Sequence, residues 1–168
     1  MNVRPKSVPI LGLVLSMNLI GCAVDEPKIS AEFNQSASLA GQLQANPLQW
    51  KVITSSIDRA GSTMSTLYGN DLAIRYARTS SQHDYPVGAE LSLVTWAQTE
   101  DGRWFGAKIP AQVKSVEFVT VESAPDGTHS FSYQEFTGTP LKMSSTQQSL
   151  TPSDRTAYLL SQRAAVMP

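Results

Sequence analysis

The stretch that decides the fold is residues 89–122, which read AELSLVTWAQTEDGRWFGAKIPAQVKSVEFVTVE. Within it, Leu91 and Leu93 fall on one pleat of an extended chain, and Val94 and Trp96 fall on the other. Because apolar side chains occupy both pleats, the segment predicts a central strand that is covered on both faces of a sheet.

Turn signals divide this region into short strands. Residues 99–102 (TEDG) predict one hairpin turn, and residues 124–127 (APDG) predict another. Further strands are predicted at 63–68, 103–109, 113–121 and 131–136, with Pro110 ending the strand before it. The connections are too short for crossover helices, so the sheet is predicted to be antiparallel.

Two helices are predicted beside the sheet. One covers residues 72–78 and is capped by Asn70 or Asp71. The other begins at Thr151, where Pro152 suits the first helical position. We therefore predict an α+β fold: a single domain over residues 48–168, made of an antiparallel β-sheet with packed helices.

Composition excludes several classes of protein. The chain has 168 residues, enough for one ordinary domain, and its mean hydropathy of -0.16 with 16% charged residues excludes a charge-rich disordered chain. Thirteen Lys and Arg face fourteen Asp and Glu, so no basic excess exists to bind nucleic acid. One cysteine excludes an internal disulfide framework and a multi-cysteine metal site.

Residues 1–21 have the pattern of a secretory signal. Arg4 and Lys6 precede an apolar run at 8–20, which is shorter than the ~20 residues that a membrane span needs. The sequence LIGC at its end resembles the bacterial lipobox, which predicts signal cleavage between Gly21 and Cys22 and lipidation of Cys22. A free buried cysteine after an ordinary signal peptide is the alternative.

The lipobox pattern also predicts location. Residues 22–47 are polar and rich in small side chains, and we interpret them as the lipidated N-terminus and a tether. The expected location is the bacterial cell envelope, with the lipid as the membrane anchor. Ala23 after the cysteine resembles an outer-membrane address, so we expect the domain to face the periplasm.

Candidate functional residues are few. Trp96, Trp104 and Phe105 could line an apolar pocket, although large aromatic residues more often fill a core.

His83 and His129 are weak candidates for haem ligands, because both fall in predicted polar loops. They are 46 positions apart, and this spacing does not indicate a metal site. The acidic residues Glu100, Asp101, Glu117 and Glu122 are interpreted as solvated charges rather than catalytic pairs. No catalytic residue is identified.

Several short segments occur in an order that is typical of one family. They are Trp50 and the runs LYGNDLA (67–73), YPVGA (85–89), VTW (94–96), WFGAKIP (104–110) and VEFV (116–119). Together they resemble the cytochrome P-460 family, sheet-rich relatives of the cytochromes c-prime. The resemblance implies a domain dominated by an antiparallel sheet with packed helices. In the haem members it also implies hydroxylamine or nitric oxide chemistry.

The haem members of that family resemble one another in a C-x-x-C-H near the C-terminus, where two thiolates and a histidine hold the haem. The corresponding region of this chain has neither Cys nor His. We therefore expect no cofactor and a binding or structural module rather than an enzyme, with an unidentified protein or small molecule as partner. Haem held without covalent bonds, in redox or gas sensing, is the alternative, and a hydrolase with an unrecognised site is the remaining hypothesis.

Overall fold

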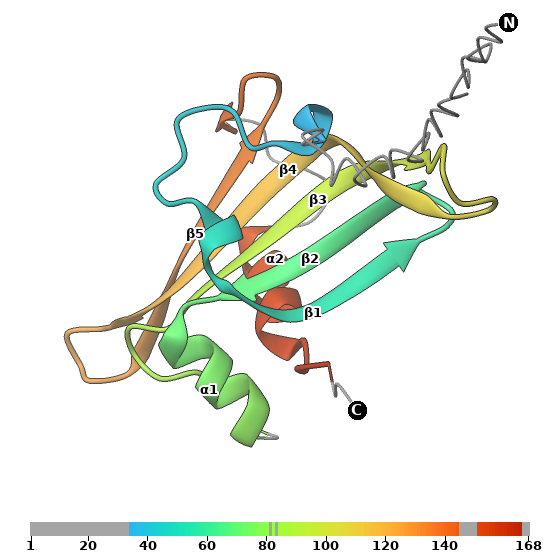
Figure 1. The fold of residues 1–168 in the computed structure, drawn as a ribbon. Coiled ribbons are helices and arrows are strands. Elements are labelled where there is room, and N and C mark those ends of the chain that lie inside the picture. The colour runs from blue at the N-terminus through green and yellow to red at the C-terminus, as the bar shows by residue number, and fades with distance from the viewer. Residues whose placement is uncertain (1–33, 81, 83, 145–150, 166–168) are drawn as a thin grey trace, which may run out of the picture. The chain divides into compact units, whose positions relative to one another are not determined.

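The computed structural model describes residues 34–80, 82, 84–144 and 151–165. Six strands form one antiparallel sheet in which each strand pairs with its neighbour in sequence (Figure 1). They are β1 (Lys51–Asp58), β2 (Thr63–Gly69), β3 (Glu90–Glu100), β4 (Lys108–Ser123), β5 (His129–Thr137) and β6 (Lys142–Met143). The predicted α+β fold with an antiparallel sheet is confirmed.

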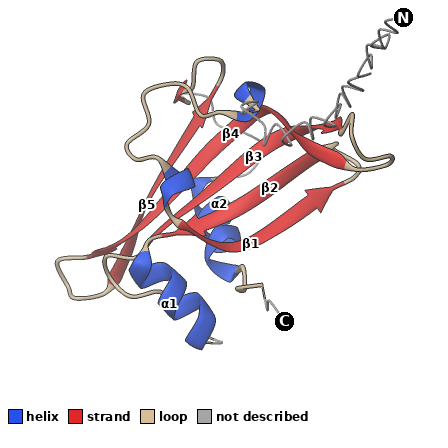
Figure 2. Ribbon diagram, in the orientation of Figure 1, coloured by secondary structure: helices blue, strands red, loops and turns tan. Residues whose placement is uncertain are grey.

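Within the described residues, two α-helices accompany the sheet, α1 (Asp71–Thr79) between β2 and β3 and α2 (Pro152–Ser161) after β6 (Figure 2). Asn70 caps α1, because its side chain accepts a hydrogen bond from the Ala73 amide. Thr151 caps α2 in a reciprocal capping box with Asp154. No helix in the described part of the chain is long and apolar enough to cross a membrane.

The prediction that β3 is covered on both faces is confirmed. Leu91 and Leu93 are buried in a cluster with α1 and α2, whereas Val94 and Trp96 are buried in a second cluster on the opposite face. β4 behaves in the same way, with Val119 in the first cluster and Phe118 in the second. The two central strands therefore need a cover on each side.

The helices cover the first face. Ile74 of α1 and Leu159 and Leu160 of α2 pack in the cluster that contains Leu67 and Val121 of the sheet. After α2, the Ala165 amide donates a hydrogen bond to the Ile53 carbonyl of β1 at 2.8 Å. The chain from α2 to Ala165 thus reaches the β1 edge of the sheet.

Residues 34–50 cover the second face. This segment contains two short 3-10 helices, η1 (Gln35–Ala37) and η2 (Pro47–Gln49). The Trp96 indole donates a hydrogen bond to the Ala37 carbonyl at 2.9 Å. Apolar side chains of the segment pack over the same cluster: Ala37, Leu39, Leu43, Ala45 and Trp50.

The described part of the predicted tether therefore belongs to the folded domain. Residues 22–33 lie outside the described residues. From Asn34 onward the chain packs against the second face of the sheet. Gly41 forms a parallel bridge with Leu141, where a Cβ atom would overlap the Leu141 backbone. A glycine is therefore required at this close approach.

Pro110 does not end a strand, contrary to the sequence prediction. It lies inside β4 and pairs with Gln98, next to register shifts on either side of Trp96. Proline has no backbone N–H to donate to a neighbouring strand, and it is tolerated where the regular hydrogen bonding of the sheet is interrupted. The residues predicted as a separate strand at 103–109 instead form most of the β3–β4 connection, and β4 starts only at Lys108.

Replacing Trp96 tests the cover of the second face. We expect Trp96→Ala to lower the free energy of unfolding by about 3–5 kcal/mol, because it empties a large buried site and removes the bond to Ala37. Trp104→Ala is the control, since that side chain is 71% exposed, and it should change stability by no more than about 0.5 kcal/mol. Urea melts of both variants make the measurement. Equal effects would contradict the assignment of Trp96 to the core.

Candidate binding site between the sheet and α2

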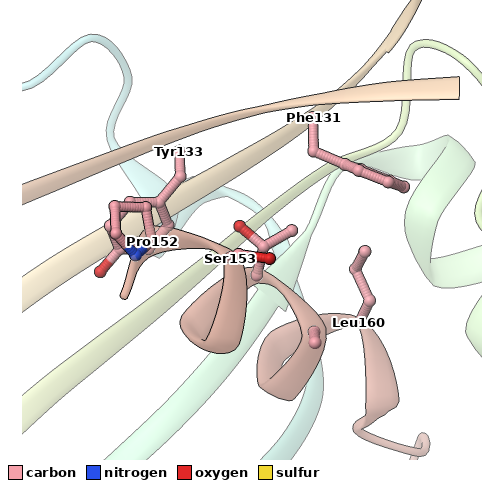
Figure 3. Close-up of a pocket in the computed structure, with 7 residues that line it drawn as sticks. Phe131, Tyr133, Pro152, Ser153 and Leu160 are labelled. Carbon is pink, nitrogen blue, oxygen red and sulfur yellow. The ribbon is translucent and has the colours of Figure 1, made fainter. Parts of the chain in front are cut away.

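A cavity of about 500 Å³ lies between β5 and α2 (Figure 3). Small-molecule sites in proteins usually measure roughly 300–1,000 Å³, so its size suits a ligand. Phe131 points from β5 toward the helix, and Leu160 points from α2 toward the strand. The full lining is Phe131, Tyr133, Pro152, Ser153, Thr156, Ala157 and Leu160.

The periodicity of the two elements explains this lining. Phe131 and Tyr133 are two residues apart on β5, so they share one face of the sheet. Ser153, Thr156 and Leu160 are spaced by three and four residues, so they form one stripe along α2. A strand face and a helix stripe therefore form opposite walls of the cavity.

A buried ion pair joins α2 to the sheet beside the cavity. Glu117 of β4 is 3% exposed and accepts two hydrogen bonds from the Arg155 guanidinium, at 2.9 Å from Nε and 2.6 Å from Nη2. The Tyr133 hydroxyl donates a third bond to Glu117 Oε2 at 2.8 Å. This bidentate geometry is the strong form of the arginine–carboxylate pair, and it fixes α2 on β4.

The surroundings of Tyr133 and Arg155 keep the first protonated and the second positively charged. Burial, and then the Glu117 charge, raise the pKa of Tyr133 well above its ordinary value of 10.0, so its hydroxyl stays a donor. The hydrogen bonds to Glu117 raise the pKa of Arg155, so it stays a cation. Glu135 lies opposite Glu117 in the β4–β5 ladder, and burial followed by the Glu117 charge raises its pKa.

The lining of the cavity offers apolar contact and hydroxyl hydrogen bonding. Its walls are aromatic and aliphatic, and Ser153 and Thr156 add hydroxyl groups that can donate or accept hydrogen bonds. The adjacent Arg155 and Glu117 charges satisfy each other. In the described part of the chain, no group of three or more His, Cys, Asp or Glu side chains is arranged to hold a metal ion.

The three aromatic residues singled out from the sequence do not enclose a common pocket. Trp96 is buried on the opposite face of the sheet, where it contributes to a second cavity of about 530 Å³. Trp104 and Phe105 lie in the β3–β4 connection, where they are 71% and 110% exposed and line neither cavity. Trp96 thus belongs to the core, and the other two form part of the surface.

The predicted histidines and carboxylates are also separated. His129 Nδ1 lies 2.9 Å from Asp84 Oδ1 at the start of β5, and His83 lies outside the described residues. Glu100 pairs with Lys108 at 3.0 Å on the surface. Gly21 and Cys22 lie outside the described residues as well.

The interpretation of Glu117 as a solvated charge is wrong. The sequence carried one signal of its burial: Glu117 shares its pleat with Val119 and Val121, which are both buried. A single carboxylate in such a strand needs a partner. That partner is Arg155, 38 positions away, and no local spacing points to it.

The haem that the family resemblance implies does not fit this lining. Axial ligands to haem iron are His, Cys, Met or Tyr, and thioether attachment requires cysteine thiols. Of these, the lining offers only Tyr133, whose hydroxyl is already committed to Glu117 and whose pKa is raised. His129 is on the same strand but is not part of the lining.

Removing one partner of the buried pair tests its role. We expect Arg155→Met to lower the free energy of unfolding by about 3–5 kcal/mol, because Glu117 then stays buried without a counter-charge. The double variant Glu117→Gln/Arg155→Met is the control and should cost clearly less, since it leaves no buried charge. Denaturant melts compare the two. Equal losses would show that the packing of Arg155, and not the unpaired carboxylate, sets the cost.

Comparison with known proteins agrees with this architecture. The model of the family described as cytochrome P460 matches residues 48–153, more than half of the chain. The match includes every strand and the first residues of α2. A search of curated proteins gave no match. The chain belongs to the cytochrome P460 family.

Proposed function

We propose that this protein is a haem-free member of the family, held in the bacterial cell envelope by a lipid on Cys22, that binds a small uncharged molecule between β5 and α2. The observation that carries the proposal is the cavity of about 500 Å³ whose apolar walls meet two hydroxyl groups. The expected role is binding rather than catalysis.

The lining indicates the class of ligand. Phe131, Pro152 and Leu160 favour an apolar body, because they gain most when water leaves the cavity. Ser153 and Thr156 favour one neutral polar group, such as a hydroxyl or carbonyl. A charged ligand would need a counter-charge, but Arg155 is already paired with Glu117. The proposed ligand is therefore neutral, with an apolar body and one hydrogen-bonding group.

The proposed anchor is supported by the N-terminal sequence. The only cysteine of the chain follows LIG at the end of a short apolar run, which is the position that lipidation requires. Stable attachment needs more than one acyl chain, and the modification at a lipobox cysteine supplies several. Ala23 favours the outer membrane, with the domain in the periplasm.

The second candidate is haem bound without covalent attachment, in redox or gas sensing. It is favoured by His129, which is two residues from Phe131 and thus on the same face of β5, with Asp84 bonded to Nδ1. A hydrogen-bonded carboxylate on one ring nitrogen is common for histidines whose other nitrogen binds a metal. An optical spectrum of protein purified from haem-replete cells separates the two: a Soret band supports this candidate, and its absence supports the first.

Filling the cavity tests the proposed ligand site. The probe is the uncharged dye N-phenyl-1-naphthylamine, which has an apolar body and one N–H group. We expect Ala157→Trp to weaken dye binding at least about tenfold, because the indole occupies part of the cavity, and a loss of about 1.4 kcal/mol in binding suffices for that.

The matched control is Ser161→Trp, which adds the same ring to the same helix outside the lining. It should leave the affinity for the dye unchanged. Fluorescence titration gives both values. If both variants bind as the wild type does, the dye does not occupy this cavity and the proposed site is wrong.

Replacing the cysteine tests the anchor. We expect Cys22→Ser to abolish lipidation, because a hydroxyl is a far weaker nucleophile than a thiolate. The variant should leave the detergent phase or accumulate unprocessed. Detergent-phase partitioning and intact mass make the comparison. If wild type and variant partition identically and have the same mature mass, the protein is not a lipoprotein.

A further inference from the structure

The β3–β4 connection presents an exposed aromatic tip, which we define as Trp104 and Phe105. Trp104 is 71% exposed and Phe105 is 110% exposed, the two highest values among the large hydrophobic residues that the structure describes. Ile57, near the end of β1, is 64% exposed. The Gln98 amide donates a hydrogen bond to the Ser62 carbonyl at 2.9 Å, so the β1–β2 hairpin lies beside the base of this connection. Two adjacent aromatic side chains with this much exposure form an apolar surface that indicates a binding site.

Hydrogen bonds give the connection a defined shape. The Asp101 amide donates to the Ala107 carbonyl, and the Ala107 amide donates to the Trp104 carbonyl, both at 3.0 Å. The Glu100–Lys108 pair closes the base at 3.0 Å. The aromatic tip is therefore held out from the sheet by a structured turn.

The tip carries little net charge. Asp101 and Arg103 of the connection balance each other, as do Glu100 and Lys108 at the ends of the two strands. A partner would therefore be recognised by apolar contact and not by electrostatic attraction. Trp and Phe are suited to the boundary between lipid headgroups and acyl chains, where the Trp N–H can remain hydrated while the ring is buried.

The described chain begins at the same end of the sheet. The Asn34 side-chain amide donates to the Pro110 carbonyl at 2.5 Å, and Pro110 pairs with Gln98 next to the base of the hairpin. Figure 1 shows η1 and the β3–β4 hairpin at one end of the sheet, with α1 at the other. Cys22 and Asn34 are 12 positions apart, which a fully extended chain spans in at most about 40 Å.

We propose that Trp104 and Phe105 insert into the interface of the bilayer that carries the lipid on Cys22, and so orient the domain on that membrane. The inference rests on the lipid anchor of the proposed function, because the chain that follows Cys22 enters the described domain at this end of the sheet. The occupant of the aromatic tip is thus the lipid surface itself.

The test uses the full lipidated protein in vesicles of phosphatidylethanolamine and phosphatidylglycerol with brominated acyl chains, which quench nearby tryptophans. We expect quenching in the wild type and loss of most of it in Trp104→Phe, because Trp96 is buried and Trp50 packs against the core. Unchanged quenching in the variant, or none in the wild type, would overturn the proposal.

Two further variants place a tryptophan at other exposed aromatic positions in the Trp104→Phe background. Phe105→Trp should restore quenching, because it returns an indole to the tip. Phe131→Trp is the matched control at the start of β5, toward the other end of the sheet, and should not restore it. Equal quenching in both would show non-specific contact with the bilayer and contradict the assigned orientation.

The mass of the peptide that contains Cys22, measured on the same preparation, separates this inference from the proposed anchor. An acylated cysteine without quenching of Trp104 overturns the aromatic tip alone. Quenching without acylation overturns the anchor and supports the tip. The tip could instead join two copies of the chain. In that case quenching is absent, the wild type is a dimer, and the variant Trp104→Ala/Phe105→Ala is a monomer. That result would also overturn the inference.

Discussion

The two central strands bury apolar side chains on both of their faces, and this constraint organises the rest of the chain. Leu91 and Val119 require a cover on one side, and Val94 and Phe118 require a cover on the other. Sheets of this kind cannot leave either face in water without exposing a large apolar surface. α1 and α2 cover the first face, and residues 34–50 cover the second. The segment before β1 is therefore as much part of the fold as the helices are.

The position of α2 determines the cavity. Glu117 and Arg155 link the sheet and the helix at one point, and Ala165 links the chain after the helix to β1. A buried ion pair often adds little net stability compared with well-packed apolar residues. Its effect here is on the position of α2. Because Arg155 is hydrogen-bonded to Glu117, the helix stripe that contains Ser153, Thr156 and Leu160 faces β5. The ligand site we propose therefore depends on a contact that is not itself part of the lining.

Local signals made much of the fold predictable. Two apolar pleats in residues 91–96 identified a central strand, and Asn70 and Thr151 marked the helix starts, because capping depends on residues only a few positions away. Pro110 was misread because a proline is tolerated where the ladder is irregular, and the register shifts beside it leave no trace in the sequence.

The candidate site was much less predictable, because its contacts join distant parts of the chain. The pleat that Glu117 shares with Val119 and Val121 points to its burial, but nothing local identifies Arg155, 38 positions away, as its partner. The packing of residues 34–47 depends on the indole of Trp96, 59 positions from its partner Ala37. Aromatic composition likewise left open a pocket or a core role for three residues, and burial separates Trp96 from Trp104 and Phe105. Composition and local spacing carry no information on such tertiary contacts.

The two proposals together imply a direction of ligand access. Phe131 and Tyr133 pair with Val121 and Val119 near the end of β4, whereas the aromatic tip precedes the start of the same strand. From Ile109 to Val121 the strand rises by roughly 40 Å, at about 3.3 Å per residue. With the tip in the bilayer interface, the cavity would lie at the end of the domain that is farther from the membrane. A ligand would then reach it from the aqueous periplasm, and its neutral polar group would meet Ser153 and Thr156 without passing through lipid.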